Sequence, residues 1–137
     1  APQTSDEILK MLSDPSAAVR AWGVRCAGDA NAVADEVQER IVVLAHDPSP
    51  EVQRQVAVAS VKVKGIDTLR VLVEVLAHCG DDPLIPQIVW QNLHPLLETR
   101  SAEFLKLVKE YDLKATPNLA NLMPRVTERI LGRSKSP

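Results

Sequence analysis

The sequence is poor in aromatic residues: two tryptophans, one tyrosine and one phenylalanine occur among 137 residues. Hydrophobic residues still make up 45% of the chain, so its core must be built from Val, Leu, Ile and Ala. The length fits one domain. No segment alternates apolar and polar residues for long enough to predict a half-buried strand. These features predict an all-α fold.

Long apolar runs are also absent. The longest, Ile41–Ala45, is far shorter than the ~18 residues that span a bilayer, so we expect no membrane span. No signal-peptide pattern is present, and the first residue is Ala1 rather than Met. We therefore expect this chain to be processed or excised from a larger protein.

An excess of positive charge is missing too, because the formal net charge is −2. Affinity for nucleic acid comes largely from phosphate neutralisation, so we expect no nucleic-acid partner. The charge is uneven: residues 1–99 carry 8 Lys/Arg and 14 Asp/Glu, and residues 100–137 carry 8 and 4. A basic C-terminal segment that contacts an acidic partner is one interpretation. A solvated helix face with a polar tail is the favoured one.

Chemical motifs are scarce. Two cysteines, Cys26 and Cys79, cannot form a disulfide framework, and we expect buried free thiols. Glycine-rich phosphate loops, a Gly-x-Ser-x-Gly elbow and the Cys-x-x-Cys-His haem signature do not occur. The sequence predicts no catalytic residue and no cofactor.

A repeated phrase organises the chain. Asp14-Pro, Asp47-Pro and Asp82-Pro each precede a helical pattern, at intervals of 33 and 35 residues. Aspartate can cap a helix, and proline fits its first turn. Two helices per repeat predict an α-solenoid of about four helical hairpins over residues 1–133, with a disordered tail at 134–137.

Apolar periodicity gives the expected helices. In the second helix the expected buried stripe is Val19, Trp22 and Cys26, with Gly23 as a further candidate, and Gly28-Asp29 is expected to close the helix. Proline predicts a break near His94, before Pro95, and an interruption or kink at Pro124. The expected helices are 5–12, 14–27, 31–46, 50–64, 67–79, 83–99, 101–112 and 116–132.

The phrase Asp-Pro-x-x-x-Val-Arg at Asp14–Arg20 resembles the second helix of HEAT repeats in their short bacterial form. Asp47–Gln53 matches with Gln53 in place of Arg, and Arg54 follows it. The resemblance implies a right-handed HEAT-like superhelix. It also implies that Asp14, Arg20 and Asp47 form a ladder between repeats, and Asp82 marks the third joint.

A longer stretch, Asp81–His94, resembles the helical segment of large secreted proteins of planctomycete-type bacteria. These proteins carry a sugar-dehydrogenase-like propeller before that segment and a c-type cytochrome after it. The resemblance covers most of residues 5–133. It implies a non-catalytic scaffold within a larger redox protein of the cell envelope, periplasmic or secreted. A cytoplasmic location is the alternative.

Two groups of residues are candidates for binding. We expect a protein partner on the surface of the second helices, with Arg25, Gln55, Lys62 and Gln91 as contacts, and a monomeric chain. Trp22 and Trp90 are interpreted as core residues, with exposed anchors as the alternative. The competing function is a HEAT-like enzyme such as a DNA-base glycosylase or a bilin lyase, and the net charge of −6 over residues 1–99 opposes the DNA enzyme.

The histidines leave one further alternative. Stacked repeats would bring His46 and His78 within about 10 Å of each other, the spacing of packed helices. A metal site would need more ligands, for which Asp47, Asp81 and Asp82 are near in sequence. We favour instead the interaction of each histidine with the carbonyl end of its helix, and expect no metal.

Overall fold

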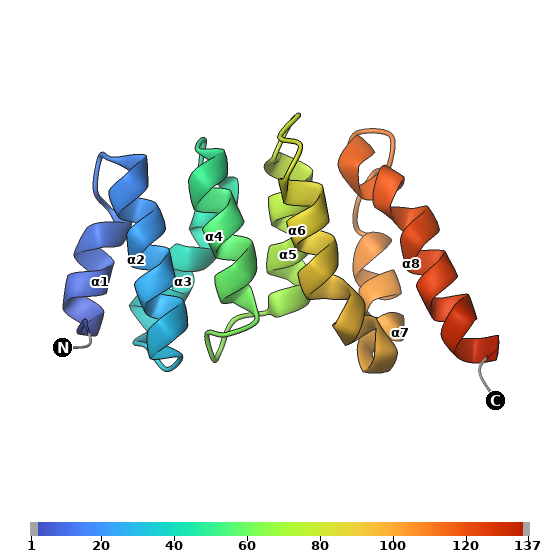
Figure 1. Cartoon of the computed structure of the whole chain (residues 1–137), viewed down its shortest axis with the longest axis horizontal. Helices are drawn as coiled ribbons and strands as arrows, with labels where there is room; N and C mark the ends of the chain where they lie inside the picture. The colour runs from blue at the N-terminus through green and yellow to red at the C-terminus, as the bar shows by residue number, and fades with distance from the viewer. Residues whose placement is uncertain (1–2, 136–137) are drawn as a thin grey trace.

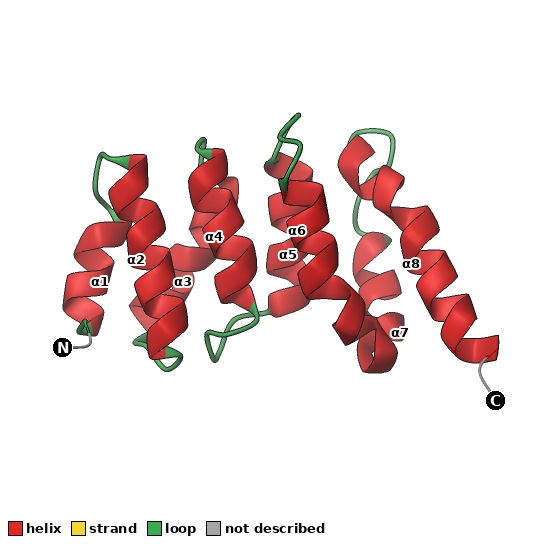
Figure 2. Ribbon diagram, viewed as in Figure 1, coloured by secondary structure: helices red, strands yellow, loops and turns green. Residues whose placement is uncertain are grey.

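The computed structural model describes residues 3–135, and every regular element in this range is helical (Figure 2). Two short 3₁₀ helices, η1 (Leu44–His46) and η2 (His94–Leu96), accompany eight α-helices. These are α1 (Ser5–Leu12), α2 (Ala17–Ala30), α3 (Asp35–Val43), α4 (Pro50–Ser60), α5 (Thr68–His78), α6 (Ile85–Leu93), α7 (Leu97–Val108) and α8 (Pro117–Lys135).

The helices pair into four hairpins that follow one another along the long axis of the molecule (Figure 1). The first helices of the hairpins, α1, α3, α5 and α7, form what we name the first-helix row. The second helices, α2, α4, α6 and α8, form the second-helix row, in which α2 packs on α4 and α4 on α6. The prediction of an all-α solenoid of about four hairpins is confirmed.

The core runs continuously through the hairpins and is almost entirely aliphatic, as the composition predicts. Phe104 is the one aromatic side chain buried within the described residues, since Trp90 and Tyr111 are half-buried and Trp22 is 53% exposed. Each hairpin therefore covers apolar surface of its neighbours, as a solenoid requires.

The buried side of α2 differs from its prediction. Val19 and Cys26 are half-buried and Trp22 is exposed, so the predicted stripe is wrong at these three positions, whereas the candidate Gly23 is buried. The buried residues are Ala21, Val24 and Ala27 together with two glycines. Small residues dominate this face, and at Gly23 the packing against α1 leaves no room for a Cβ.

The two glycines of α2 differ in how closely their neighbours pack. A Cβ at Gly23 would lie only 2.8 Å from the Cβ of Met11, whereas one at Gly28 would lie 3.5 Å from the Cβ of Ala59, an ordinary contact distance. Gly28 is buried inside the helix and is not the predicted helix end. The helix continues to Ala30 and ends at Asn31, whose φ is +73°.

The three repeated aspartates act as helix-start residues. Asp14 Oδ1 accepts a hydrogen bond from the Ser16 amide at 2.8 Å, and Asp47 Oδ1 accepts one from the Ser49 amide at 2.9 Å. Asp82 Oδ1 accepts from the amides of Leu84 and Ile85, both at 3.0 Å. The aspartates therefore bond to the backbone at the start of each helix, whereas the N-cap positions themselves are occupied by Ser16, Ser49 and Leu84.

Arginines connect successive aspartates. Arg20 donates from Nε to Asp47 Oδ2 at 2.9 Å and from Nη2 to Asp47 Oδ1 at 3.1 Å. Its Nη1 donates to the carbonyl oxygens of Asp14 and Pro15. The next pair is weaker: Arg54 Nη1 lies 3.3 Å from Asp82 Oδ2. The ladder therefore exists, with Arg54 in the second repeat in place of the residue at position 53.

Gln53 stands at the position that Arg20 occupies in the first repeat. The residue is 2% exposed, and its side chain forms hydrogen bonds with backbone carbonyls instead of an ion pair. Its Nε2 donates to the Ala45 carbonyl at 3.1 Å and to the His78 carbonyl at 3.0 Å. These carbonyls belong to the ends of the first helices of the second and third hairpins. One side-chain amide thus joins two neighbouring hairpins of the first-helix row.

The C-terminal part of the chain has irregular helices. The α-helix stops at Leu93 and gives way to η2, which confirms the predicted break near His94. Arg100, with φ −123° and ψ 24°, marks a kink inside α7. Pro124 lies inside α8, which continues through residues 134 and 135 of the predicted tail. Residues 136 and 137 lie outside the described range, as do residues 1 and 2.

The ladder leads to a stability prediction. We expect Asp47→Ala to lower the free energy of unfolding by about 3 kcal/mol, because it leaves the guanidinium of Arg20 without its partner and removes the hydrogen bond to the Ser49 amide. Asp82→Ala should cost about 1–2 kcal/mol, because its pair is longer and Arg54 is more exposed. Urea unfolding followed by circular dichroism measures both. Equal losses would contradict the unequal strength of the two joints.

Gln53 gives a second prediction. Gln53→Met keeps the side-chain length but leaves the Ala45 and His78 carbonyls without their donor, which should cost about 1–3 kcal/mol of unfolding free energy. The matched control is Gln55→Met on the same helix, where the side chain is half-buried and bonds to neither carbonyl. The control should unfold within about 0.5 kcal/mol of the parent chain. Similar losses in both variants would show that the amide bridge is unimportant.

Candidate functional site

The residues predicted to contact a partner all lie at the surface of the second-helix row. Arg25 on α2 and Gln91 on α6 are exposed, and Gln55 on α4 is half-buried. Lys62 is exposed but follows the end of α4, where its side chain lies close to Gly28 of α2. Their role in binding stays a prediction.

Both tryptophans lie on this row with an arginine over the ring. The Arg25 guanidinium lies 5.5 Å from the Trp22 ring centre, and that of Arg125 lies 4.7 Å from the Trp90 ring centre. Such cation–π contacts are worth about 0.5–1 kcal/mol at exposed sites. The core interpretation is wrong for Trp22, whereas Trp90 is half-buried against the core. Together these residues form two cation–aromatic pairs.

Arg25 and Arg125 differ from five other arginines in how their charge is balanced, and within the described part of the chain they share the lack of a carboxylate partner with Arg40 of α3. Among the side chains that the structure describes, neither has a carboxylate within 4.0 Å. Five other arginines do have one, namely Arg20, Arg54, Arg70, Arg100 and Arg129. The second-helix row therefore presents two guanidinium groups that are stacked but not neutralised.

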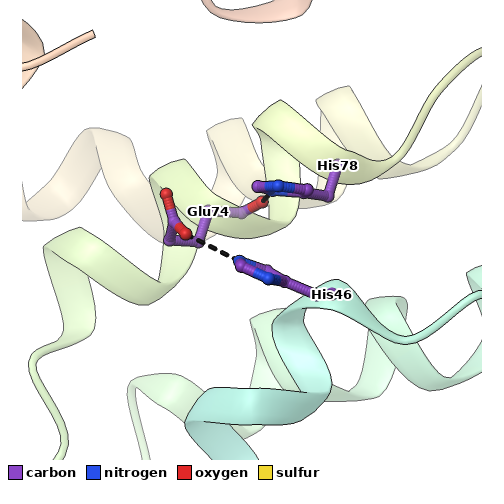
Figure 3. A group of neighbouring side chains, drawn as sticks. All are labelled: His46, Glu74 and His78. Carbon is purple, nitrogen blue, oxygen red and sulfur yellow. Dashed lines mark hydrogen bonds and ion pairs between the residues drawn. The ribbon is translucent and has the colours of Figure 1, made fainter.

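The first-helix row carries a different cluster, made by His46, Glu74 and His78 (Figure 3). His46 ends η1, and the other two lie one turn apart on α5. His46 Nε2 lies 2.6 Å from Glu74 Oε1, and the two imidazole rings stack with their centres 3.8 Å apart. His78 Nδ1 lies 2.9 Å from the Glu74 carbonyl oxygen. One possible ligand atom from each residue falls within 4.8 Å of the others.

Tyr111, just beyond the end of α7, completes the surroundings of Glu74 by donating its hydroxyl to Oε2. Burial raises the pKa of Glu74, but the hydrogen bonds from Tyr111 and His46 outweigh it and the pKa is lowered overall. Burial, followed by the bond to Glu74, raises the pKa of Tyr111. At neutral pH the site therefore holds a carboxylate beside a neutral phenol.

A groove of about 330 Å³ borders this cluster between α3, η1 and α5. His46 and Glu74 form part of its wall, and Arg70 lies further along α5. Val42 and Val43 line it and are 40% and 57% exposed. The cluster is thus open to solvent and lies next to apolar surface.

The sequence located part of this cluster. His46 and His78 lie within the expected 10 Å, and the bond from His78 to a carbonyl of its own helix agrees with the favoured interpretation. Asp47 and Asp82, considered as further ligands, are instead paired with arginines. Sequence reasoning missed Glu74, although its position four residues before His78 places both on one face of a helix.

The thiols are separate from this chemistry. Cys26 is half-buried and Cys79 is buried, and both are free, as expected. Burial raises the pKa of each thiol, so both are protonated at neutral pH. Cys79 Sγ donates to the Leu76 carbonyl at 3.3 Å. These thiols are packing groups with low reactivity.

A family model described as HEAT repeats matches residues 5–90, which include all three repeated aspartate joints. No curated protein and no solved structure matches significantly. Among the described residues, none of the helices has the length and apolarity needed to cross a membrane.

The Glu74 site predicts a pH-dependent stability. The folded-state pKa of Glu74 is lowered, so its carboxylate stabilises the fold above the unfolded value of about 4.3, and this contribution is lost as the pH falls through the folded pKa. Glu74→Gln should therefore be less stable than the parent chain at pH 7, with a difference that shrinks in acid. Urea unfolding in chelator-containing buffer at several pH values measures it. A difference that stays constant with pH would contradict the prediction.

Proposed function

The chain belongs to the HEAT-repeat family, and we propose that it is a non-catalytic protein-binding module whose second-helix row docks a carboxylate-rich segment of a partner. HEAT repeats commonly mediate protein–protein interaction. The observation that carries the proposal is the pair of guanidinium groups, Arg25 and Arg125, that stack on tryptophans and have no carboxylate partner among the described side chains.

The chemistry of these pairs favours an acidic partner. A guanidinium stacked on an aromatic ring keeps its N–H edges free, and those edges match the two oxygens of a carboxylate. Tryptophan and arginine are also the residues most enriched among the energetic centres of protein interfaces. Trp22 is 53% exposed, so burial by a partner would remove much of its surface from water.

The two cation–aromatic pairs are separated along the second-helix row. Trp22 lies on α2, and Trp90 lies on α6, with α4 packed between these helices. Gln55 on α4 and the exposed Lys62 beyond it provide polar contacts along the way. A partner segment that spans three hairpins would therefore meet cationic and amide groups in succession.

The wider context is part of the same proposal. The likeness of Asp81–His94 to secreted planctomycete-type proteins supports a place for this module in a larger redox protein of the cell envelope, periplasmic or secreted. The encoded sequence on both sides of residues 1–137 tests this. A propeller before the module and a Cys-x-x-Cys-His motif after it would support the context, and unrelated flanking domains would reject it.

Peptide binding tests the docking surface. An oligo-glutamate peptide should bind and change the fluorescence of Trp22, whereas an oligo-lysine peptide of equal length should not. The double variant Arg25→Glu with Arg125→Glu should weaken the acidic peptide at least about tenfold, because two charge-assisted contacts are lost. Fluorescence anisotropy of labelled peptides, repeated at rising salt, gives the affinities.

The control for this experiment is Lys106→Glu, which makes the same charge change as either single substitution, at an exposed position of α7 in the first-helix row. It should leave the affinity for the acidic peptide within about twofold, since it alters none of the proposed contacts and salt screens exposed charges. Equal losses in the control and the double variant would reject the second-helix row as the site. Tight, salt-sensitive binding of duplex DNA in place of the peptide would favour a nucleic-acid function instead.

A further inference from the structure

We propose that His46, Glu74 and His78 form a binding site for a divalent transition-metal ion of the zinc class, bridging the second and third hairpins. The site lies on the first-helix row, away from the cation–aromatic pairs, so the proposal does not rest on the docking function. It replaces the expectation, drawn from sequence, that these histidines serve only their helix ends.

The donor set fits such an ion. Two imidazoles and one carboxylate are ligands that zinc takes, with metal–ligand distances of about 2.0–2.2 Å. In a tetrahedral site the donor atoms therefore lie about 3.3 Å apart. The three donors here already lie within 4.8 Å of one another, and both histidines are exposed at the surface. Side-chain rotation alone can close the remaining distance.

The surrounding hydrogen bonds prepare the donors. Because a carbonyl oxygen can only accept, the bond from His78 Nδ1 to the Glu74 carbonyl places the ring proton on Nδ1 and leaves the Nε2 lone pair for a metal. Tyr111 donates to Glu74 Oε2, which leaves Oε1 as the ligand atom. Metal-binding residues typically have such supporting partners.

The backbone is held in place as well. Gln53 donates to the carbonyl of Ala45, next to His46, and to the carbonyl of His78 itself. The amide is buried, so it fixes the end of η1 against the end of α5. Two ligands from different hairpins are therefore held near each other before any ion binds.

A hydrogen bond between His46 and Glu74 accounts for only part of this arrangement. A proton shared between His46 Nε2 and Glu74 Oε1 explains the contact of these two residues. It does not explain why His78, whose Nε2 lone pair is unused, lies beside the same carboxylate (Figure 3). A metal ion uses all three donors. Three protein ligands leave one position for water, in a site that borders the Val42–Val43 groove.

Cobalt(II) is the probe for the test, because its visible spectrum reports tetrahedral coordination. The full chain, without an affinity tag that contains histidine and freed of metal by a chelator, is titrated with Co²⁺ and then with Zn²⁺ as competitor. We expect one equivalent to bind, with displacement by Zn²⁺ and none by Mg²⁺. A Zn²⁺ concentration a hundredfold above its Kd should raise the thermal unfolding midpoint by about 5–10 °C.

Single variants assign the ligands. His46→Gln, Glu74→Gln and His78→Gln should each weaken Co²⁺ binding by more than the 10–100-fold that loss of a supporting partner typically costs. Tyr111→Phe should weaken it by about tenfold. The matched control is His94→Gln, because His94 packs near Trp90 and lies outside the cluster. Circular dichroism confirms that each variant is folded.

Three outcomes would overturn the proposal. The first is the absence of a stoichiometric tetrahedral Co²⁺ spectrum. The second is an equal loss of affinity in His94→Gln and in the three ligand variants, which would indicate non-specific binding. The third is loss of binding in Cys79→Ser with full binding in His78→Gln, which would identify a thiolate site instead.

Discussion

The structure depends on one buried carboxylate, that of Asp47. It accepts a hydrogen bond from the amide of Ser49, the residue that precedes α4, and pairs with two nitrogens of Arg20 from the preceding hairpin, and the residue is only 7% exposed. A buried carboxylate is tolerated only when its bonds are satisfied, so the position of α2 relative to α4 is tightly defined. At this distance Gly28 of α2 lies in ordinary packing contact with Ala59 of α4. A polar contact at the start of one helix thus helps to fix the packing of two hairpins.

The joint between the second and third hairpins solves the same problem with different residues. Here Arg54 contacts the aspartate of the next hairpin, and Gln53 donates hydrogen bonds to the ends of η1 and α5. This bridge ends on the His78 carbonyl and on the residue before His46. Gln53 stands where the first repeat has Arg20, and it bonds to the two helix ends that carry His46 and His78. The substitution of glutamine at position 53 therefore helps to hold the two stacked histidines of different hairpins in place. No corresponding pair can form at the first joint, because the chain has three histidines and the third is His94.

How far the sequence predicts this structure depends on the range of the interactions involved. The helices and joints follow from short signals, such as the Asp-Pro pairs and apolar periodicity, and they appear where expected. Apolar periodicity assigns the large Trp22 to the buried stripe of α2, whereas small Ala and Gly residues together with Val24 form that stripe. In the histidine cluster, the proximity of His46 and His78 follows from the repeat, but the contact of Tyr111 with Glu74 joins residues 37 positions apart in different hairpins. Such contacts depend on how the last hairpin packs, which Pro95 and the kink at Arg100 make irregular.

The two candidate sites are mechanically related, because both lie across the joint between the second and third hairpins. On the second-helix row, the separation of the Trp22 and Trp90 pairs is set by how α2, α4 and α6 stack. On the first-helix row, His46 and His78 meet only when the same hairpins have the observed relative position. A ligand that holds the histidines together would therefore favour the hairpin arrangement that gives one spacing of the cation–aromatic pairs. The size of this effect equals the difference in the ligand's binding free energy between the two hairpin arrangements. By linkage, a partner that required this spacing would strengthen binding at the histidines by the same factor.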